Sequence, residues 1–205
     1  FNPSTQAISA DVGFIGTGLS GAEAPVRVNI QPGETKRIVD VLGKHWGLKS
    51  AQGVLTVHAV GAMAPIAQVE LYEDSDPGKR YGQAMQPQSI DEASGVGDKQ
   101  ALLGLAQDAA YRTVGWLYAP EGPAEVDLVY RDLTPERKVI GTLSGLKIKA
   151  GGVRAIVPSS HPVPDDSGRF TVEVVVKAGK VLSGAQVTNA LNNDPAFVRG
   201  QPAPR

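Results

Sequence analysis

Short runs of alternating apolar and polar residues recur along this chain of 205 residues. Val26, Val28 and Ile30 alternate with polar neighbours, and residues 54–60 show the same pattern. A period of two places the apolar side chains on one face of a β-strand, which predicts antiparallel strands with one buried face. Further strands are predicted at residues 7–15, 66–72, 81–85, 111–118, 125–131, 153–157 and 168–175. The chain is therefore predicted to be all-β.

The segments between these runs carry turn signals. Pro32-Gly33 fits the central positions of a turn, because proline fixes φ and glycine accepts a positive φ. A single helical turn is predicted at residues 43–47, and Trp46 is expected to close the end of a β-sandwich there.

Two parts of the sequence are similar and predict an internal duplication. Ile30-Gln-Pro-Gly33 returns as Ile148-Lys-Ala-Gly151 after 118 positions, and residues 55–59 return as 170–174 after 115 positions. The first strand is matched at Val12-Gly13-Phe14 and Val114-Gly115-Trp116, with an offset of 102. Agreement in phase matters, because a slip of one residue moves every side chain to the other face of the sheet.

The rise in offset from 102 to 118 predicts that the first copy lacks 16 residues between Gly18 and Ile30, which is about one strand. Two explanations stay open: the first copy has lost a strand, or residues are missing from the sequence. The predicted organisation is a first module at residues 1–88, a polar linker at 89–100 and a second module at 101–205. Ser89 and Glu92 have the spacing of a small capping box within that linker.

Composition and charge exclude several classes of function. The chain is 41% hydrophobic and 20% charged, which is typical of folded protein. Its formal net charge of −1 gives no broad positive surface for nucleic acid or an anionic membrane. No run of about 18 apolar residues is present, so a membrane-spanning helix is not expected. Without cysteine there is neither a disulfide framework nor thiolate chemistry. Because the chain starts at Phe1 without a secretory signal, we expect a processed product or part of a longer protein.

Several short motifs together resemble a known group of proteins. They are Val12-Gly13-Phe14, Pro32-Gly33, Asp40-Val41-Leu42, Trp46-Gly47-Leu48 and Ala51-Gln52-Gly53. This combination resembles the tandem Ig-like (immunoglobulin-like) β-sandwich modules of large secreted or surface-attached bacterial proteins. The resemblance implies two antiparallel Ig-like sandwiches in tandem and an extracellular or cell-surface location, and it carries no catalytic residues. The second module departs from the pattern after Val157, where Pro158-Ser-Ser-His-Pro162 replaces the Trp-Gly-Leu turn.

Acidic loops are the candidate metal sites. Glu73, Asp74 and Asp76 place several hard oxygen ligands close together, as calcium requires, and Asp165-Asp166 forms a smaller acidic pair. Neither loop follows the EF-hand order, and a solvated turn is the competing interpretation. No cofactor other than calcium at the first loop is predicted.

Catalytic groups are not indicated by spacing. His45, His58 and His161 lack the spacings of helical metal motifs, and we interpret them as structural or exposed. Ser159 and Ser160 lie near His161 in sequence, but a nucleophile and its base must also meet in space with a third group orienting the base. Gly-x-Ser-x-Gly is absent. We therefore expect no enzymatic activity.

Tyr118 and Tyr130 are the candidate ligand-binding residues. They are interpreted as an exposed aromatic pair that would stack on a sugar, whereas Trp116 is interpreted as core. The predicted function is a structural or adhesive module of an exported bacterial protein, acting in surface assembly or docking a protein or glycan partner, with sheet-edge pairing as one route. Three alternatives stay open: a carbohydrate-binding accessory module, an enzyme with a site between the two modules that uses His161 and Asp166, and a self-associating filament subunit completed by a neighbour's strand.

Overall fold

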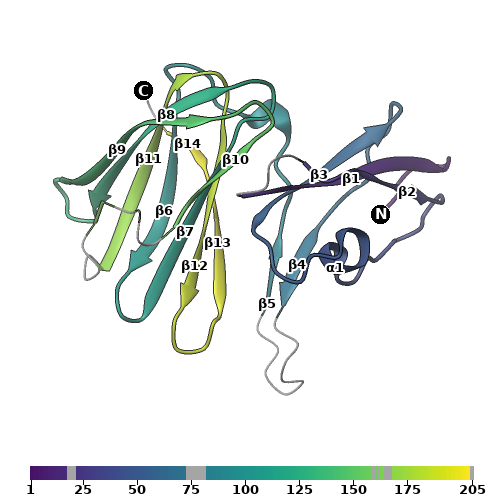
Figure 1. The fold of residues 1–205 in the computed structure, drawn as a ribbon, viewed down its shortest axis with the longest axis horizontal. Coiled ribbons are helices and arrows are strands. Elements are labelled where there is room, and N and C mark those ends of the chain that lie inside the picture. The colour runs from purple at the N-terminus through teal and green to yellow at the C-terminus, as the bar shows by residue number, and fades with distance from the viewer. Residues whose placement is uncertain (18–21, 73–81, 158–159, 161, 164–167, 204–205) are drawn as a thin grey trace. The chain divides into compact units, whose positions relative to one another are not determined.

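A computed structural model describes residues 1–17, 22–72, 82–157, 160, 162–163 and 168–203. Strands make up 54% of the structure and helices 5%, in open antiparallel sheets, so the all-β prediction is confirmed. No helix in these ranges is long and apolar enough to cross a membrane. The chain divides into two compact units, Phe1–Gln68 and Val69–Arg205 (Figure 1).

The first unit contains one sheet with the strand order β2-β1-β3. Its strands are β1 (Ile8–Gly16), β2 (Val26–Ile30) and β3 (Gly53–Val60). The bounds of β2 agree with the prediction at both ends. Ile8, Val28 and Ile30 form the buried centre, against which Val12 and Ile38 pack.

A short helix, α1 (Val41–Trp46), lies between β2 and β3 in sequence. Asp40 caps its start by accepting a hydrogen bond from the Gly43 amide, and Gly47 ends it with φ of +67°. The indole of Trp46 lies 5.9 Å from the ring of Phe14, and its Nε1 donates to the carbonyl of Ala24. The predicted helical turn is therefore confirmed, with Trp46 covering the aromatic end of β1.

The second unit contains two larger sheets and one small one. The five-stranded sheet has the order β14-β6-β11-β8-β9, and the four-stranded sheet has the order β10-β7-β12-β13. The bounds of the first sheet are β6 (Lys99–Gln107), β8 (Ala124–Asp132), β9 (Val139–Ile148), β11 (Gly168–Ala178) and β14 (Gln201–Ala203). Those of the second are β7 (Tyr111–Tyr118), β10 (Val153–Ile156), β12 (Leu182–Asn189) and β13 (Pro195–Arg199). The small sheet pairs β4 (Val69–Tyr72) with β5 (Gly82–Met85).

One apolar core fills the second unit. It takes buried residues from both large sheets, which is consistent with a β-sandwich. The predicted linker at 89–100 contains a short 3₁₀ helix, Ile90–Glu92, and the start of β6. The capping box of Ser89 and Glu92 is formed at that helix, as predicted.

The duplication is not confirmed in the form that the sequence predicts. β7 and β11, the predicted counterparts of β1 and β3, lie in different sheets, whereas β1 and β3 pair with each other. The inward-facing residues of β7 are Thr113, Gly115 and Leu117, so Trp116 faces away from the core. The match of Phe14 with Trp116 therefore aligned opposite faces, and the core assignment of Trp116 is wrong.

A different match agrees with the strand pairing. β8 lies between β9 and β11, so the order β9-β8-β11 repeats the order β2-β1-β3. In the first sheet Phe14 pairs with Leu55 and Val12 with Val57; in the second, Tyr130 pairs with Val172 and Leu128 with Val174. The offsets are then 116 for β1, 118 for β2 and 117 for β3. With offsets this uniform, this match needs no deficit of 16 residues between Gly18 and Ile30.

Candidate functional site

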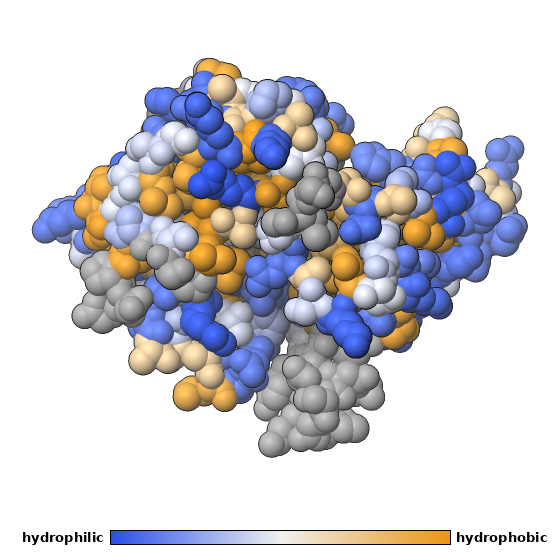
Figure 2. Space-filling view, in the orientation of Figure 1, coloured by the Kyte–Doolittle hydropathy of each residue, from blue (hydrophilic) through white to orange (hydrophobic). Residues whose placement is uncertain are grey.

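The surface that stands out is the inner face of the first sheet near β3. We define this inner face by Val12, Phe14, Leu55, Val57 and Ala59. Val12 pairs with Val57, Phe14 with Leu55, and Ala59 with the buried Ala10 of β1. Directly opposed residues of an antiparallel pair project to the same side, so these five form one apolar row. Figure 2 shows apolar residues interspersed with polar ones on the face of the first unit that it draws.

Matched positions in the two units differ in exposure. Val57 is 42% exposed, whereas its counterpart Val174 is fully buried at 0%. Val172, the counterpart of the half-buried Leu55, is 2% exposed. Since the strand order and pairing around these residues are the same, the difference comes from what lies on the sheet. Strand β11 has β6 at its second edge, and the core residues of β7 and β12 cover it.

The second edge of β3 is an open edge in the described parts of the chain, where β3 pairs only with β1. An unpaired edge presents a row of backbone donors and acceptors that can accept another strand. The opposite edge of this sheet is different. At β2, the Lys36 ammonium donates to the carbonyl of Asn29 at 3.0 Å, and the side-chain amide of the buried Asn2 donates to the carbonyl of Ile30 at 3.0 Å. Successive carbonyls of a strand point to opposite edges, and Asn2 also donates to the carbonyl of Gln6 just before β1, so Asn2 lies on the β1 side. The side chain at the free edge of β2 is that of Lys36.

The outer face of the first sheet is polar. Asp11 and Arg27 form a two-pronged ion pair across β1 and β2, and this hydrogen bond to the guanidinium lowers the pKa of Asp11. His58 projects on the same face, beside Asp11, and is exposed as predicted. The sheet is thus amphipathic, with its apolar side exposed at β3.

The predicted calcium ligands Glu73, Asp74 and Asp76 lie outside the described residues. The same holds for His161 and for Asp165 and Asp166. Within the described ranges, no group of three or more histidine, aspartate or glutamate residues is arranged to hold a metal ion.

The two predicted ligand-binding tyrosines are not exposed, so that expectation is wrong. Tyr130 is 0% exposed on β8, in phase with Val126 and Leu128, and its ring lies 5.8 Å from that of Phe170. Tyr118 is 6% exposed at the end of β7. Burial raises the pKa of both phenols, most strongly for Tyr130. Neither ring presents a face to solvent for stacking on a sugar.

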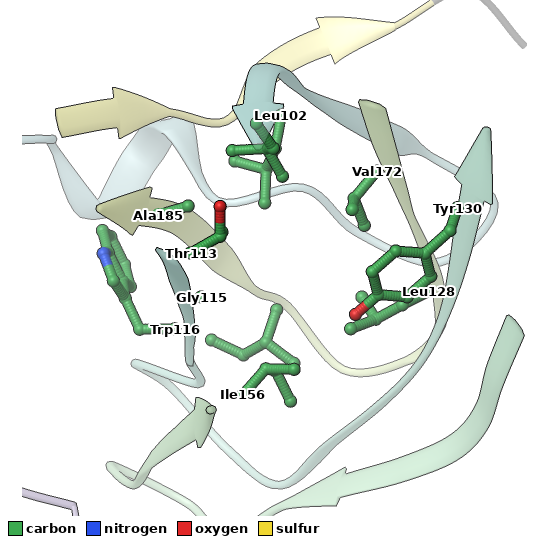
Figure 3. A pocket seen from close by; sticks show the side chains of 11 residues that line it. Leu102, Thr113, Gly115, Trp116, Leu128, Tyr130, Ile156, Val172 and Ala185 are labelled. Atoms are coloured by element: carbon green, nitrogen blue, oxygen red, sulfur yellow. The ribbon is translucent and has the colours of Figure 1, made fainter. Parts of the chain in front are cut away.

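A small pocket lies inside the second unit (Figure 3). Leu102, Ile156 and Tyr130 reach it from different strands, and Gly115 leaves the space open because it has no side chain. The Thr113 hydroxyl at its wall donates to the carbonyl of Ala106 at 2.6 Å. With an apolar lining and a hydroxyl engaged by the backbone, this pocket belongs to the core.

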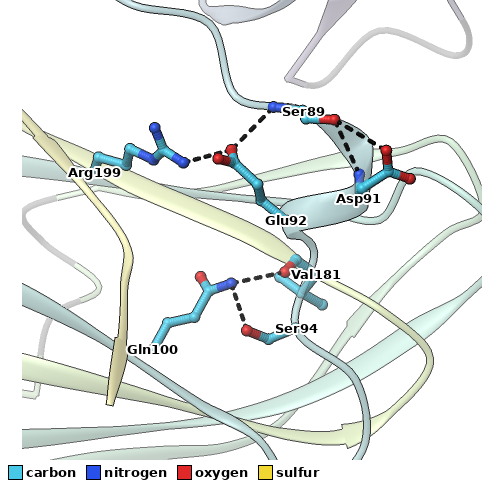
Figure 4. Close-up of polar contacts among 7 residues, drawn as sticks. All are labelled: Ser89, Asp91, Glu92, Ser94, Gln100, Val181 and Arg199. Atoms are coloured by element: carbon cyan, nitrogen blue, oxygen red, sulfur yellow. Dashed lines mark hydrogen bonds and ion pairs between the residues drawn. The ribbon is translucent and has the colours of Figure 1, made fainter.

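Polar side chains join the two large sheets at one end of the core (Figure 4). The buried Gln100 of β6 donates to Ser94 at 2.9 Å and to the carbonyl of Val181 at 3.0 Å, and it accepts from Ser183 of β12. Nearby, Glu92 pairs with Arg199, which lowers the pKa of Glu92. These contacts satisfy buried polar groups and hold the sheets in register.

No protein-family model matches the sequence, and no curated protein matches it. The site therefore rests on the internal comparison of the two units.

Sequence reasoning did not find the open edge of β3 or the exposed Val57. A signal was present in the offsets. When β1 is matched to β8, the strands β1, β2 and β3 return as β8, β9 and β11 at a nearly constant offset. The strands β6 and β7 then have no counterpart among the described residues of the first unit.

Proposed function

We propose that this chain is a non-enzymatic structural and docking module of an exported bacterial protein, and that it binds a partner by pairing a strand with the open edge of β3. The observation that carries the proposal is Val57, an apolar residue left 42% exposed where its counterpart is fully buried. A partner strand would satisfy the backbone groups of β3, and apolar side chains beside it would cover the inner face.

The contrast between the two edges of the sheet supports this choice. Lys36 occupies a backbone acceptor at the free edge of β2, and a covering lysine is a common protection against unwanted pairing. In the described parts of the chain β3 pairs only with β1, and the apolar Val57 on this strand is exposed. The sheet therefore has a protecting lysine at its β2 edge and an unpaired backbone at its β3 edge, where another strand can bind.

The proposal includes an internal duplication with Ig-like architecture. The repeated order of three strands, the uniform offsets and the aromatic pair Phe14 and Tyr130 at one matched position support it. The exported setting, at the cell surface or outside the cell, rests on the resemblance of the motifs at Trp46-Gly47-Leu48 and Ala51-Gln52-Gly53 to surface-protein modules.

The experiment is a binding assay on the full chain with a panel of strand peptides that alternate apolar and polar residues. Hydrogen exchange followed by mass spectrometry reports protection of Gly53–Val60. We expect peptides that bind to slow exchange in this strand at least tenfold, and Val57→Lys to weaken binding at least tenfold by placing a charge on the inner face.

Leu191→Lys is the matched control, because Leu191 is 86% exposed in a turn of the second unit and the substitution adds the same charge. It is expected to bind as the wild type does. If no peptide protects Gly53–Val60, or if both variants lose binding equally, the proposed docking edge is wrong. Light scattering over a concentration series separates a partner strand from a second copy, as the filament alternative requires.

Carbohydrate binding has one observation in its favour. The rings of Trp116 and Phe197 are within 11° of parallel with centroids 6.2 Å apart, and both are partly exposed. The indole packs directly on Gly184, where a side chain would collide with it. Flat, partly exposed rings suit stacking on a pyranose. Binding on a glycan array that Trp116→Ala removes would support this function, and silence across a broad array would count against it.

A further inference from the structure

The second unit shows which kind of partner the open edge of β3 fits. We infer that the partner is a strand–turn–strand segment of the β6–β7 kind, whose first strand pairs with β3 and whose second strand lies over the inner face. This inference rests on the proposed docking function and specifies its partner. We call such a segment an arch, because its two strands belong to two different sheets.

The first strand of the arch is defined by the pairing of β6 with β11. Leu105 pairs with Phe170, Leu102 with Val172 and Gln100 with Val174. With the offset of 117, the β3 residues at those positions are Gly53, Leu55 and Val57. The partner is therefore antiparallel to β3.

The arch must also contain a bulge. Between the pairs at Leu105 and Leu102, β6 has one residue more than β11, and Gly104 takes φ of +74° there. Leu105 and Leu102 thereby both reach the core, with exposures of 1% and 4%, although they are three residues apart. A glycine between two inward leucines is thus a recognition feature of the partner.

The second strand of the arch covers the face. Gly115 and Leu117 of β7 line the same internal space as Leu128 and Tyr130 of β8 (Figure 3). The counterparts of Leu128 and Tyr130 are Val12 and Phe14. Phe14 is already covered by Trp46, so the part of the inner face that a single edge strand would leave in water is at Val57, which is 42% exposed. An arch covers both the edge and this part of the face.

The two strands of the arch are tied together near their turn. The Thr113 hydroxyl of β7 donates to the carbonyl of Ala106 of β6, and the Thr113 amide donates to the side chain of Gln107 at 3.1 Å. Asp108 accepts the amides of Ala110 and Tyr111 in the turn itself. The arch is therefore a locally defined unit that can be supplied as one segment.

A folded second copy of the chain does not supply this segment without opening. Leu105 and Leu117 are each 1% exposed, because β6 and β7 of the folded chain are built into its own core. The partner is accordingly a separate segment with this strand pattern, and a folded second copy is not the expected occupant.

The test uses the full chain and a synthetic peptide of residues 97–119 with a lysine tag for solubility. We expect this peptide to slow hydrogen exchange in Gly53–Val60 at least tenfold, with exchange in Gly168–Ala178 unchanged. A peptide of the same composition in permuted order and the peptide carrying L105D and L117D are expected to give no protection. The chain variant Val57→Lys is expected to bind the peptide at least tenfold more weakly, and Leu191→Lys to bind it normally.

The outcomes separate the two proposals. Equal protection by the arch peptide and the permuted peptide would overturn the arch and leave strand docking at β3 in place. Protection of β3 by other strand peptides but not by the arch peptide would also overturn the arch and leave strand docking in place. If neither these peptides nor the wider panel protects Gly53–Val60, both the arch and the docking edge are wrong.

Discussion

Strand β3 pairs with β1 and strand β11 pairs with the matched strand β8, yet β3 is half-exposed and β11 is buried. Each pairs with an apolar row on its neighbour: Val57 with Val12, and Val174 with Leu128. The difference teaches that the sequences of β3 and β11 both specify a strand with an apolar face suited to burial, although that face is fully covered in β11 alone. Exposure of such a strand is informative because its counterpart shows the covered state.

The largest expected difference is between two identical substitutions. Val174→Ala removes two methyl groups from a fully buried site and is expected to cost about 2 kcal/mol of unfolding free energy. Val57→Ala is expected to cost about 0.5 kcal/mol or less, because the side chain is 42% exposed. Denaturant unfolding, with hydrogen exchange to follow each unit, measures both. Equal costs would break the comparison.

A smaller effect is expected at alkaline pH, where only one of two matched aromatic rings can ionise. Burial raises the pKa of Tyr130 above its ordinary value of 10.0, and its counterpart Phe14 has no ionisable group. The neutral phenol thus stabilises the folded second unit fully below pH 10.0, and this contribution falls as the pH rises further. Tyr130→Phe is expected to reduce the alkaline loss of stability of the second unit, with Tyr118 accounting for part of the remainder.

Melting temperatures at pH 8 and at pH 11, compared between wild type and Tyr130→Phe, test this. If the melting temperature of the variant falls between pH 8 and pH 11 as much as that of the wild type, Tyr130 does not contribute to the alkaline loss of stability.

The smallest expected effect concerns the polar faces. Asp11 bonds to Arg27, while its counterpart Asp127 accepts the amide of Gly145 at 2.8 Å and lies 3.8 Å from Lys177. The pKa of Asp11 is lowered, so its contribution is present above its ordinary value of 3.8 and is lost as the pH falls through the lowered pKa.

Asp11→Asn is therefore expected to lower the melting temperature of the first unit slightly at pH 7 and hardly at pH 2. Added salt is expected to shrink the effect at pH 7, because the pair is exposed. A large loss that salt leaves unchanged would mean that Asp11 has a structural role beyond this pair.

Regular alternation made part of the fold predictable from the sequence. β2 and β7 were placed at their observed bounds, and Asp40 and Gly47 explain why a helical turn forms before Trp46. Two of the strands that were not predicted, β6 and β9, contain a bulge that breaks the period of two. β6 bends at Gly104, and β9 shifts register at Gly145, where φ is +66°. After such a break, the side chains project to the face opposite to the one that strict alternation predicts.

The candidate site was harder to predict for a related reason. Tyr130 is in phase with Val126 and Leu128, so its burial was readable, but its polar hydroxyl suggested exposure. The open edge of β3 is a property of what surrounds the strand, and an alternating run such as residues 53–60 looks the same with or without a neighbour.

The lysine contact at β2 has a consequence for stoichiometry. With Lys36 occupying that edge, an added segment finds one place to bind and presents no equivalent place for the next molecule. Association would therefore stop at one segment per module, giving a one-to-one complex with a saturable isotherm in place of a growing fibre.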